Sequence, residues 1–186
     1  MTTSAIESPI RLAVSSVASL GLSVAVIFCP AFHAPLKDTS PMFSGEQRLA
    51  MLEAVCAKHP LMQVTDIEIA HGKTRYTYDT LLELQETFSN HLFYLILGGD
   101  QFAQLHLWKE VKELAKVVTF LVFARDQDEC AWPKLADIKV TFASNSLIDL
   151  SSTTIRQQLN SGKLPDNTLP PEVVSYIKEH NFFPPR

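Results

Sequence analysis

The sequence predicts an α/β fold in which a doubly wound parallel sheet is covered by helices on both faces. Three continuous apolar, β-prone runs, at residues 24–29, 92–97 and 117–123, have the composition of strands buried on both faces. Segments with apolar residues at helical spacing lie between these runs. Strands that alternate with helices are typical of βαβ units, which build parallel sheets.

Local signals place the elements in order. A helix over Arg11–Leu20 is expected to end at Gly21, since glycine is common just past a helix, and the first strong strand then ends at Pro30. Ser44 and Gln47 have the spacing of a capping box at the start of the next helix. The remaining expected elements are an extended segment at 62–69, helices at 78–88, 108–114, 151–160 and 171–179, and a weaker strand at 138–142.

The composition limits the classes of protein. With 186 residues, 46% of them hydrophobic and 19% charged, the chain fits one packed domain over 1–186. The net charge of −4 argues against binding to nucleic acid. Cys29, Cys56 and Cys130 lack CxxC spacing, which disfavours a disulfide framework and a zinc cluster. The apolar stretch at 12–32 is interrupted by polar residues and follows no basic segment, so we expect no membrane span and no signal peptide, and a cytoplasmic protein.

The first candidate site is a helix start rich in hydroxyl groups. Ser151, Ser152, Thr153 and Thr154 stand where a helix is expected to begin, and Arg156 follows. The free N–H groups and the positive dipole end of a helix attract anions, and a guanidinium fits the geometry of phosphate. An ordinary Ser/Thr N-cap with a solvated arginine has the same pattern. A triphosphate cradle and a simple cap are therefore alternatives.

Two further motifs follow the same logic. Gly98, Gly99 and Asp100 come directly after an apolar strand, where ligands bind in open α/β sheets; a simple turn with Asp100 as N-cap is the alternative. Thr77 stands at an expected helix start and could offer its hydroxyl and N–H groups to a carboxylate, while Trp108 could stack on a flat ring.

For Trp108 and the tyrosines beside Thr77, packing in the hydrophobic core is the alternative to ligand binding. Among the six histidines, none shows HxH or HExxH spacing, and His33, in the loop that also holds Lys37, is the one most expected to face a ligand. The sequence contains no G-x-S-x-G or P-loop motif.

Taken in order, these motifs resemble the bacterial nicotinate-nucleotide adenylyltransferases, which are nucleotidyltransferases with a Rossmann-like α/β fold. The resemblance runs from about Ile10 to Phe183, and Arg75 stands where the family motif S-Y-T-x-D-T-L has serine. The segments that carry it are Leu20-Gly21-Leu22, Pro35-Leu36-Lys37, Arg48 to Leu52, Tyr76 to Leu81, Gly98-Gly99-Asp100 with Trp108, Leu150 to Arg156 and Leu169 to Phe182.

The resemblance implies adenylyl transfer from ATP to nicotinate mononucleotide, giving deamido-NAD and pyrophosphate with Mg²⁺ as the ion of the ATP substrate. It implies that the ATP phosphates are held by Ser151, Ser152, Thr153 and Arg156, and that Lys37 approaches phosphate. It places Gly98, Gly99 and Asp100 beside the adenosine and the bridging region. It implies that Thr77 and Tyr78 bind the nicotinate carboxylate and that Trp108 stacks on the pyridine ring. The sequence leaves open whether the chain forms a homo-oligomer.

One departure from the family is large. The pattern G-G-x-F-x-P-x-H-x-G-H is absent and no histidine precedes His33, so no catalytic residue is assigned. The first strand of the family, central in the order 3-2-1-4-5, is also absent. Three explanations of this departure compete. Either the true start lies upstream of Met1, or the chain is a homologue that binds nucleotide without turnover, or Leu12 to Ser16 form the missing strand.

The rival functions are a catalytically impaired or truncated nucleotide-binding homologue, an adenylyltransferase with another acceptor such as phosphopantetheine, and a protein-interaction domain. The order of Thr77, Tyr78 and Trp108 disfavours the phosphopantetheine acceptor, and the hydroxyl-rich helix start disfavours an interaction domain.

Overall fold

The computed structural model describes residues 24–35, 40–124, 132–144, 152–165 and 168–182. The chain divides into two compact units, one made of Met1–Lys73 with Ile148–Arg186 and the other of Thr74–Leu147. We describe each unit by itself. That residues 1–186 form a single domain stays a prediction.

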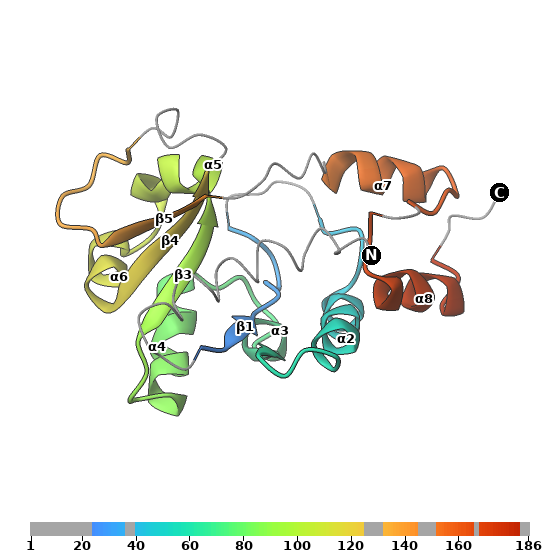
Figure 1. Cartoon of the computed structure of the whole chain (residues 1–186), viewed down its shortest axis with the longest axis horizontal. Coiled ribbons are helices and arrows are strands. Elements are labelled where there is room, and N and C mark those ends of the chain that lie inside the picture. Colours follow the sequence, from blue (N-terminus) through green and yellow to red (C-terminus); the bar gives the residue numbers. More distant parts are fainter. Residues whose placement is uncertain (1–23, 36–39, 125–131, 145–151, 166–167, 183–186) are drawn as a thin grey trace. The chain divides into compact units, whose positions relative to one another are not determined.

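The unit of Thr74–Leu147 is built on a three-stranded parallel sheet (Figure 1). Its strands β3 (Phe93–Gly98), β4 (Val118–Ala124) and β5 (Val140–Ser144) lie in the order β3-β4-β5. The helices of this unit are α4 (Thr77–Thr87), α5 (Gly99–Ala103), the 3₁₀ helix η1 (Leu105–Leu107) and α6 (Val111–Val117). Parallel strands joined through helices are the βαβ arrangement that the alternating pattern predicts.

The core of this unit lies on one face of the sheet. Leu97, Phe120 and Val122 share that face because they are register partners or lie two residues apart, and side chains alternate along a strand. Buried residues from α4, α5 and α6 pack on them, among them Leu81, Phe102 and Leu114. Phe102, Phe120, Leu114 and Val122 have no exposed surface, so this cluster forms the buried core of the unit.

The two apolar strands of this sheet differ in burial. Three consecutive residues of β4, Phe120 to Val122, are at most 1% exposed, as predicted for a strand covered on both faces. In β3, Ile96 is 42% exposed, contrary to that expectation. Ile96 alternates with the core-facing residues of β3, and among the described residues β3 has a partner strand along one edge only.

The other unit pairs a two-stranded parallel sheet with helices. Strands β1 (Val26–Phe28) and β2 (Met62–Val64) are joined in register Val26 to Met62. The helices are α2 (Gly45–Cys56), α3 (Ile67–Ala70), α7 (Ser152–Asn160) and α8 (Pro171–Glu179). Within the described part of the chain, β1 too has one strand neighbour only.

A small core joins α2, α7 and α8. Each helix contributes one buried residue: Met51, Leu159 and Ile177. Helix α2 begins as the sequence predicts, because Ser44 Oγ accepts the Gln47 N–H at 3.2 Å while Gln47 Oε1 accepts the Ser44 N–H at 2.8 Å. The capping box is therefore confirmed.

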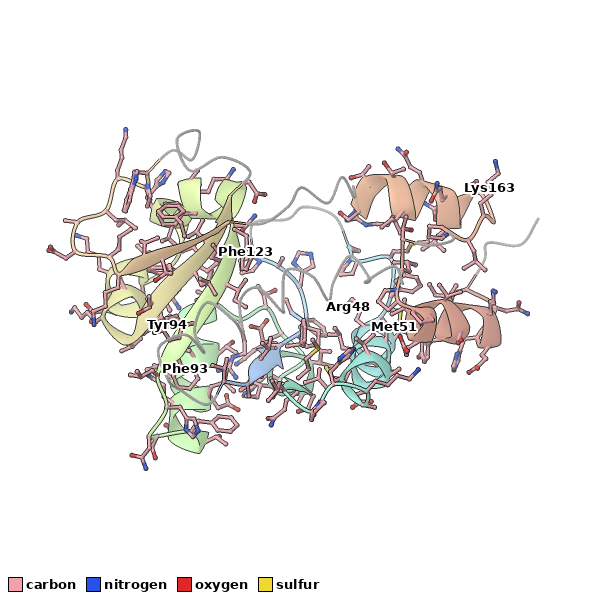
Figure 2. All side chains as sticks on the ribbon, viewed as in Figure 1. Arg48, Met51, Phe93, Tyr94, Phe123 and Lys163 are labelled. Carbon is pink, nitrogen blue, oxygen red and sulfur yellow. The ribbon has the colours of Figure 1, made fainter. Side chains whose placement is uncertain are left out.

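Arg48 fixes the loop that follows β1. Arg48 and Met51 lie one turn apart on α2 (Figure 2). The guanidinium of Arg48 donates to the carbonyl oxygens of Ala31 at 2.5 Å and of Phe32 and Phe43, each at 3.3 Å. One partly buried arginine thus pairs with three backbone carbonyls between β1 and α2.

Some expected boundaries are wrong. The segment at 62–69 is not extended throughout, since residues 67–70 form the single helical turn α3. The helix expected at 108–114 begins at Val111, after Glu110 adopts a left-handed conformation with φ 52°. Helix α8 has its expected bounds, and the expected helix at 11–20 lies outside the described residues. No helix among the described residues is long and apolar enough to span a bilayer.

Candidate functional site

The start of helix α4 has backbone N–H groups from which a carboxylate could accept hydrogen bonds. Thr77 is its first helical residue, one position before the expected bound at 78, and the N-cap residue Tyr76 makes no side-chain capping bond. The first helical hydrogen bond runs from the Thr80 N–H to the Tyr76 carbonyl at 3.2 Å. The N–H groups of Thr77, Tyr78 and Asp79 therefore precede the hydrogen-bond ladder of the helix, where a helix favours an anion.

Two cationic side chains flank this helix start. Arg75 donates from Nη1 to Glu83 Oε2 at 2.7 Å and from Nη2 to the Asp79 carbonyl at 3.0 Å. Lys109 Nζ lies 3.8 Å from Asp79 Oδ2 and 4.5 Å from the centroid of the Tyr76 ring, which is a cation–π distance. Sequence reasoning gave neither Arg75 nor Lys109 a role in binding.

Trp108 packs against the core of the same unit, as does Tyr78. The ring of Trp108 is partly buried, and its Nε1–H is buried without a hydrogen-bond partner among the described residues. The alternative to ligand binding, that these aromatic side chains belong to the hydrophobic core, therefore holds for part of each ring. Stacking on a ligand by the remaining surface of Trp108 stays a prediction.

The glycine motif forms a second helix start, at the end of β3. Gly98 ends the strand and is the N-cap of α5, so Asp100 is not the N-cap that the turn alternative assigned. A Cβ at position 98 would lie 2.7 Å from Asp100 Oδ1, closer than atoms pack. Glycine at this position is what allows the exposed Asp100 carboxylate to fold back over the strand end.

The hydroxyl-rich motif lies in the other unit, at the start of α7. Arg156 Nη2 donates to Ser152 Oγ at 2.8 Å, and both side chains, like that of Thr153, are exposed. The i, i+4 spacing brings the hydroxyl and the guanidinium to one face of the helix start, as the cradle hypothesis needs. Ser151 and Lys37 lie outside the described residues, so their predicted contacts with phosphate are untested.

The structure thus groups the predicted site residues in two sets. Helix starts and loops of the unit Thr74–Leu147 hold Thr77, Tyr78, Gly98, Gly99, Asp100 and Trp108, whereas Ser152, Thr153 and Arg156 belong to the other unit. Among the described residues, no three His, Cys, Asp or Glu side chains gather as ligands for a metal ion. Each set contains a helix start and side-chain donors, which are groups that favour an anion.

Comparison with known proteins defines the class. The sequence profile of the cytidylyltransferase-like family matches residues 10–158, and the chain belongs to this family. The parallel sheets, the family match and the similar solved structures confirm the predicted α/β fold.

Within this family, two similar curated proteins carry the same name. A probable nicotinate-nucleotide adenylyltransferase from Lactiplantibacillus plantarum is 34% identical over 158 residues, which cover 85% of this chain and 73% of the relative. One of the same name from Opitutus terrae is 32% identical, covering 86% of this chain and 83% of the relative. The resemblance inferred from the order of the motifs is confirmed.

Solved structures share the fold. Nicotinic acid mononucleotide adenylyltransferase from Plasmodium falciparum, complexed with NaAD, superposes with a TM-score of 0.65 at 17% identity, covering 92% of this chain and 88% of that one. A putative nicotinate-nucleotide adenylyltransferase from Vibrio parahaemolyticus gives a TM-score of 0.58 at 19% identity, covering 90% of each chain.

Proposed function

We propose that this protein transfers the adenylyl group of ATP to nicotinate mononucleotide, giving deamido-NAD and pyrophosphate, and that it does so in the cytoplasm as a step of NAD biosynthesis. The names of the curated relatives support the reaction. The observation in the structure that carries the proposal is the start of α4, because a carboxylated ring is what distinguishes nicotinate mononucleotide from other acceptors. There, helix N–H groups, the Thr77 hydroxyl and the nearby cation Lys109 suit a carboxylate.

The proposed roles follow the chemistry of each residue. Thr77 and Tyr78 bind the nicotinate carboxylate through hydroxyl and backbone N–H, and Trp108 stacks on the pyridine ring. Gly98, Gly99 and Asp100 border the adenosine and the bridging region. Donors for the ATP phosphates come from Ser151, Ser152, Thr153, Arg156 and Lys37.

The reaction needs positioning more than proton transfer. A phosphate oxygen of the mononucleotide attacks the α-phosphorus of ATP in line, a new P–O bond forms, and the bond to the β-phosphate oxygen breaks as pyrophosphate leaves. Donors that neutralise the oxygens during this exchange lower the barrier. A magnesium ion would enter with the ATP substrate and would help to neutralise the leaving pyrophosphate.

One alternative is a homologue that binds both substrates without turning them over. One assay separates the proposed enzyme from this alternative. The purified chain is incubated with Mg²⁺, ATP and nicotinate mononucleotide, and the release of pyrophosphate and the formation of deamido-NAD are measured. Product at a rate above the reaction without protein supports the proposal. Calorimetric binding of both substrates without product supports the alternative, and product with phosphopantetheine in place of the mononucleotide contradicts the assigned acceptor.

A further inference from the structure

Arg75 holds an unusual place at the start of α4. It precedes the N-cap residue, yet its side chain is only 11% exposed. The guanidinium reaches across the first two turns, donating to the Asp79 carbonyl at 3.0 Å and to the Glu83 carboxylate at 2.7 Å. One side chain therefore joins the segment before the helix to residues four and eight positions further on.

This arrangement stabilises the helix start without using its N–H groups. A helix start is ordinarily fixed by a Ser, Thr, Asp or Asn side chain at the N-cap that accepts an N–H of the first turn. Tyr76 at the N-cap makes no such bond. Arginine has donors and no acceptor, so Arg75 fixes the turn through the Asp79 carbonyl and cannot occupy the N–H groups of Thr77 or Tyr78.

The charges around the helix start are balanced. Arg75 pairs with Glu83, and Lys109 lies 3.8 Å from the Asp79 carboxylate. Two cations thus face two anions, and attraction of a carboxylate ligand depends on the orientation of the helix N–H groups rather than on an excess of formal charge.

We propose that Arg75 is a positioning residue which holds the first turn of α4 so that the N–H groups of Thr77 and Tyr78 face the carboxylate of the acceptor, and that it thereby sets the preference for the acid over the amide mononucleotide. This inference rests on the proposed function. Arg75 stands where the motif of the resembled family has serine, so its contacts with Asp79 and Glu83 are not part of that motif.

Three variants test the contacts that Arg75 makes with Glu83 and the Asp79 carbonyl: Arg75→Gln, Glu83→Gln and Arg75→Lys. The first two break the ion pair from either side, and lysine keeps a charge but lacks the planar fork whose two nitrogens bind Glu83 and the Asp79 carbonyl. The matched control is Lys116→Gln, which breaks the 2.7 Å pair of Lys116 with Glu113 on α6, outside the site.

The readout is the calorimetric dissociation constant for nicotinate mononucleotide, nicotinamide mononucleotide and ATP, which requires no turnover. For Arg75→Gln we expect the affinity for the acid to fall on the order of tenfold, the scale of hydrogen bonds to a charged group. The affinities for the amide and for ATP should change less than about twofold. Arg75→Lys should lie between the wild type and Arg75→Gln, and the control should match the wild type.

Each outcome decides a different point. If the wild-type chain binds no nicotinate mononucleotide, the proposed function fails and the inference with it. If the wild type binds and Arg75→Gln and Glu83→Gln lose acid and amide equally, or lose neither, Arg75 is a structural residue and the inference alone is overturned. If Arg75→Gln does not fold, the acid-to-amide ratio of Arg75→Lys decides, and a ratio equal to that of the wild type overturns the inference.

Discussion

At the residue scale, the proposed activity depends on donors placed at helix starts. Arg156 illustrates this, because its contact with Ser152 at 2.8 Å holds the guanidinium over the first turn of α7 before any ligand arrives. A donor that is already placed loses less freedom on binding phosphate than a solvated one.

Arg156→Ala should therefore raise the KM for ATP by about tenfold, the loss expected for one charge-assisted contact. Arg156→Lys should recover part of this, since it keeps the charge and loses the planar fork. Gln157→Ala, one position along the same exposed helix, is the control and should leave the KM unchanged. An ATP affinity for Arg156→Ala equal to that of the wild type would remove Arg156 from the site.

Gly98 gives a second prediction at this scale. Gly98→Ala places a methyl group where Asp100 Oδ1 lies within 2.7 Å, so the carboxylate must rotate away. We expect the affinity for ATP to fall about fivefold, with little change in stability because the Asp100 side chain is exposed and free to move.

The double variant Gly98→Ala/Asp100→Ala checks the cause. If the glycine acts only through Asp100, the double variant binds ATP as Asp100→Ala does, because the two changes share one interaction. Additive losses would show that the backbone at position 98 meets the ligand directly.

At the element scale, the ends of helices are decided by a few side chains. Helix α2 has a reciprocal capping box, and its N-terminal region also carries Arg48, which binds the carbonyls of Ala31, Phe32 and Phe43. The start of this helix and the loop after β1 are therefore held together by side chains of one turn.

Ser44→Ala should destabilise the protein by about 1 kcal/mol, because the Gln47 N–H loses its acceptor at the helix start. Urea denaturation followed by circular dichroism measures this. Ser44→Asp, which keeps an acceptor at the N-cap, is the control and should lose much less. Equal stabilities of Ser44→Ala and the wild type would mean that water replaces the cap without loss.

At the scale of the whole molecule, chain segments far apart in sequence meet in one unit. Lys58, just past α2, binds Glu172 on α8 at 2.6 Å, 114 positions away. The hydrogen bond from Lys58 lowers the pKa of Glu172 against the opposing effect of its partial burial. A carboxyl group with a lowered pKa stabilises the folded state above its ordinary pKa, and this contribution is lost as the pH falls through the lowered value.

Removal of this pair should therefore cost stability at pH 7 and not in acid. We expect Glu172→Gln and Lys58→Met each to lose up to about 1 kcal/mol at pH 7, as for a pair at the surface. The loss should shrink as the pH falls below the ordinary glutamate value of 4.5, and also as salt is added. Denaturation curves across pH 3–7 measure this, and a loss independent of pH would assign the effect to packing instead.

Much of the fold could be predicted because its signals are local. The apolar run that becomes β4, the capping box of Ser44 and the proline that begins α8 each depend on a few neighbouring residues. The misplaced helix at 108–114 had no such signal, since the left-handed turn at Glu110 occurs at a residue type that rarely adopts it. The four-residue helix α3 is too short to show a period.

The sequence alone predicts the parallel α/β class, the order of the elements and, to within one residue, the starts of α4 and α7, because hydrophobic period and capping chemistry are local properties of the chain. The three-dimensional structure was needed to show that Arg75 turns inward to Glu83 and the Asp79 carbonyl, and that Asp100 folds over Gly98. A long side chain beside a helix can equally extend into water, and its direction is chosen by the packing and charges that surround it.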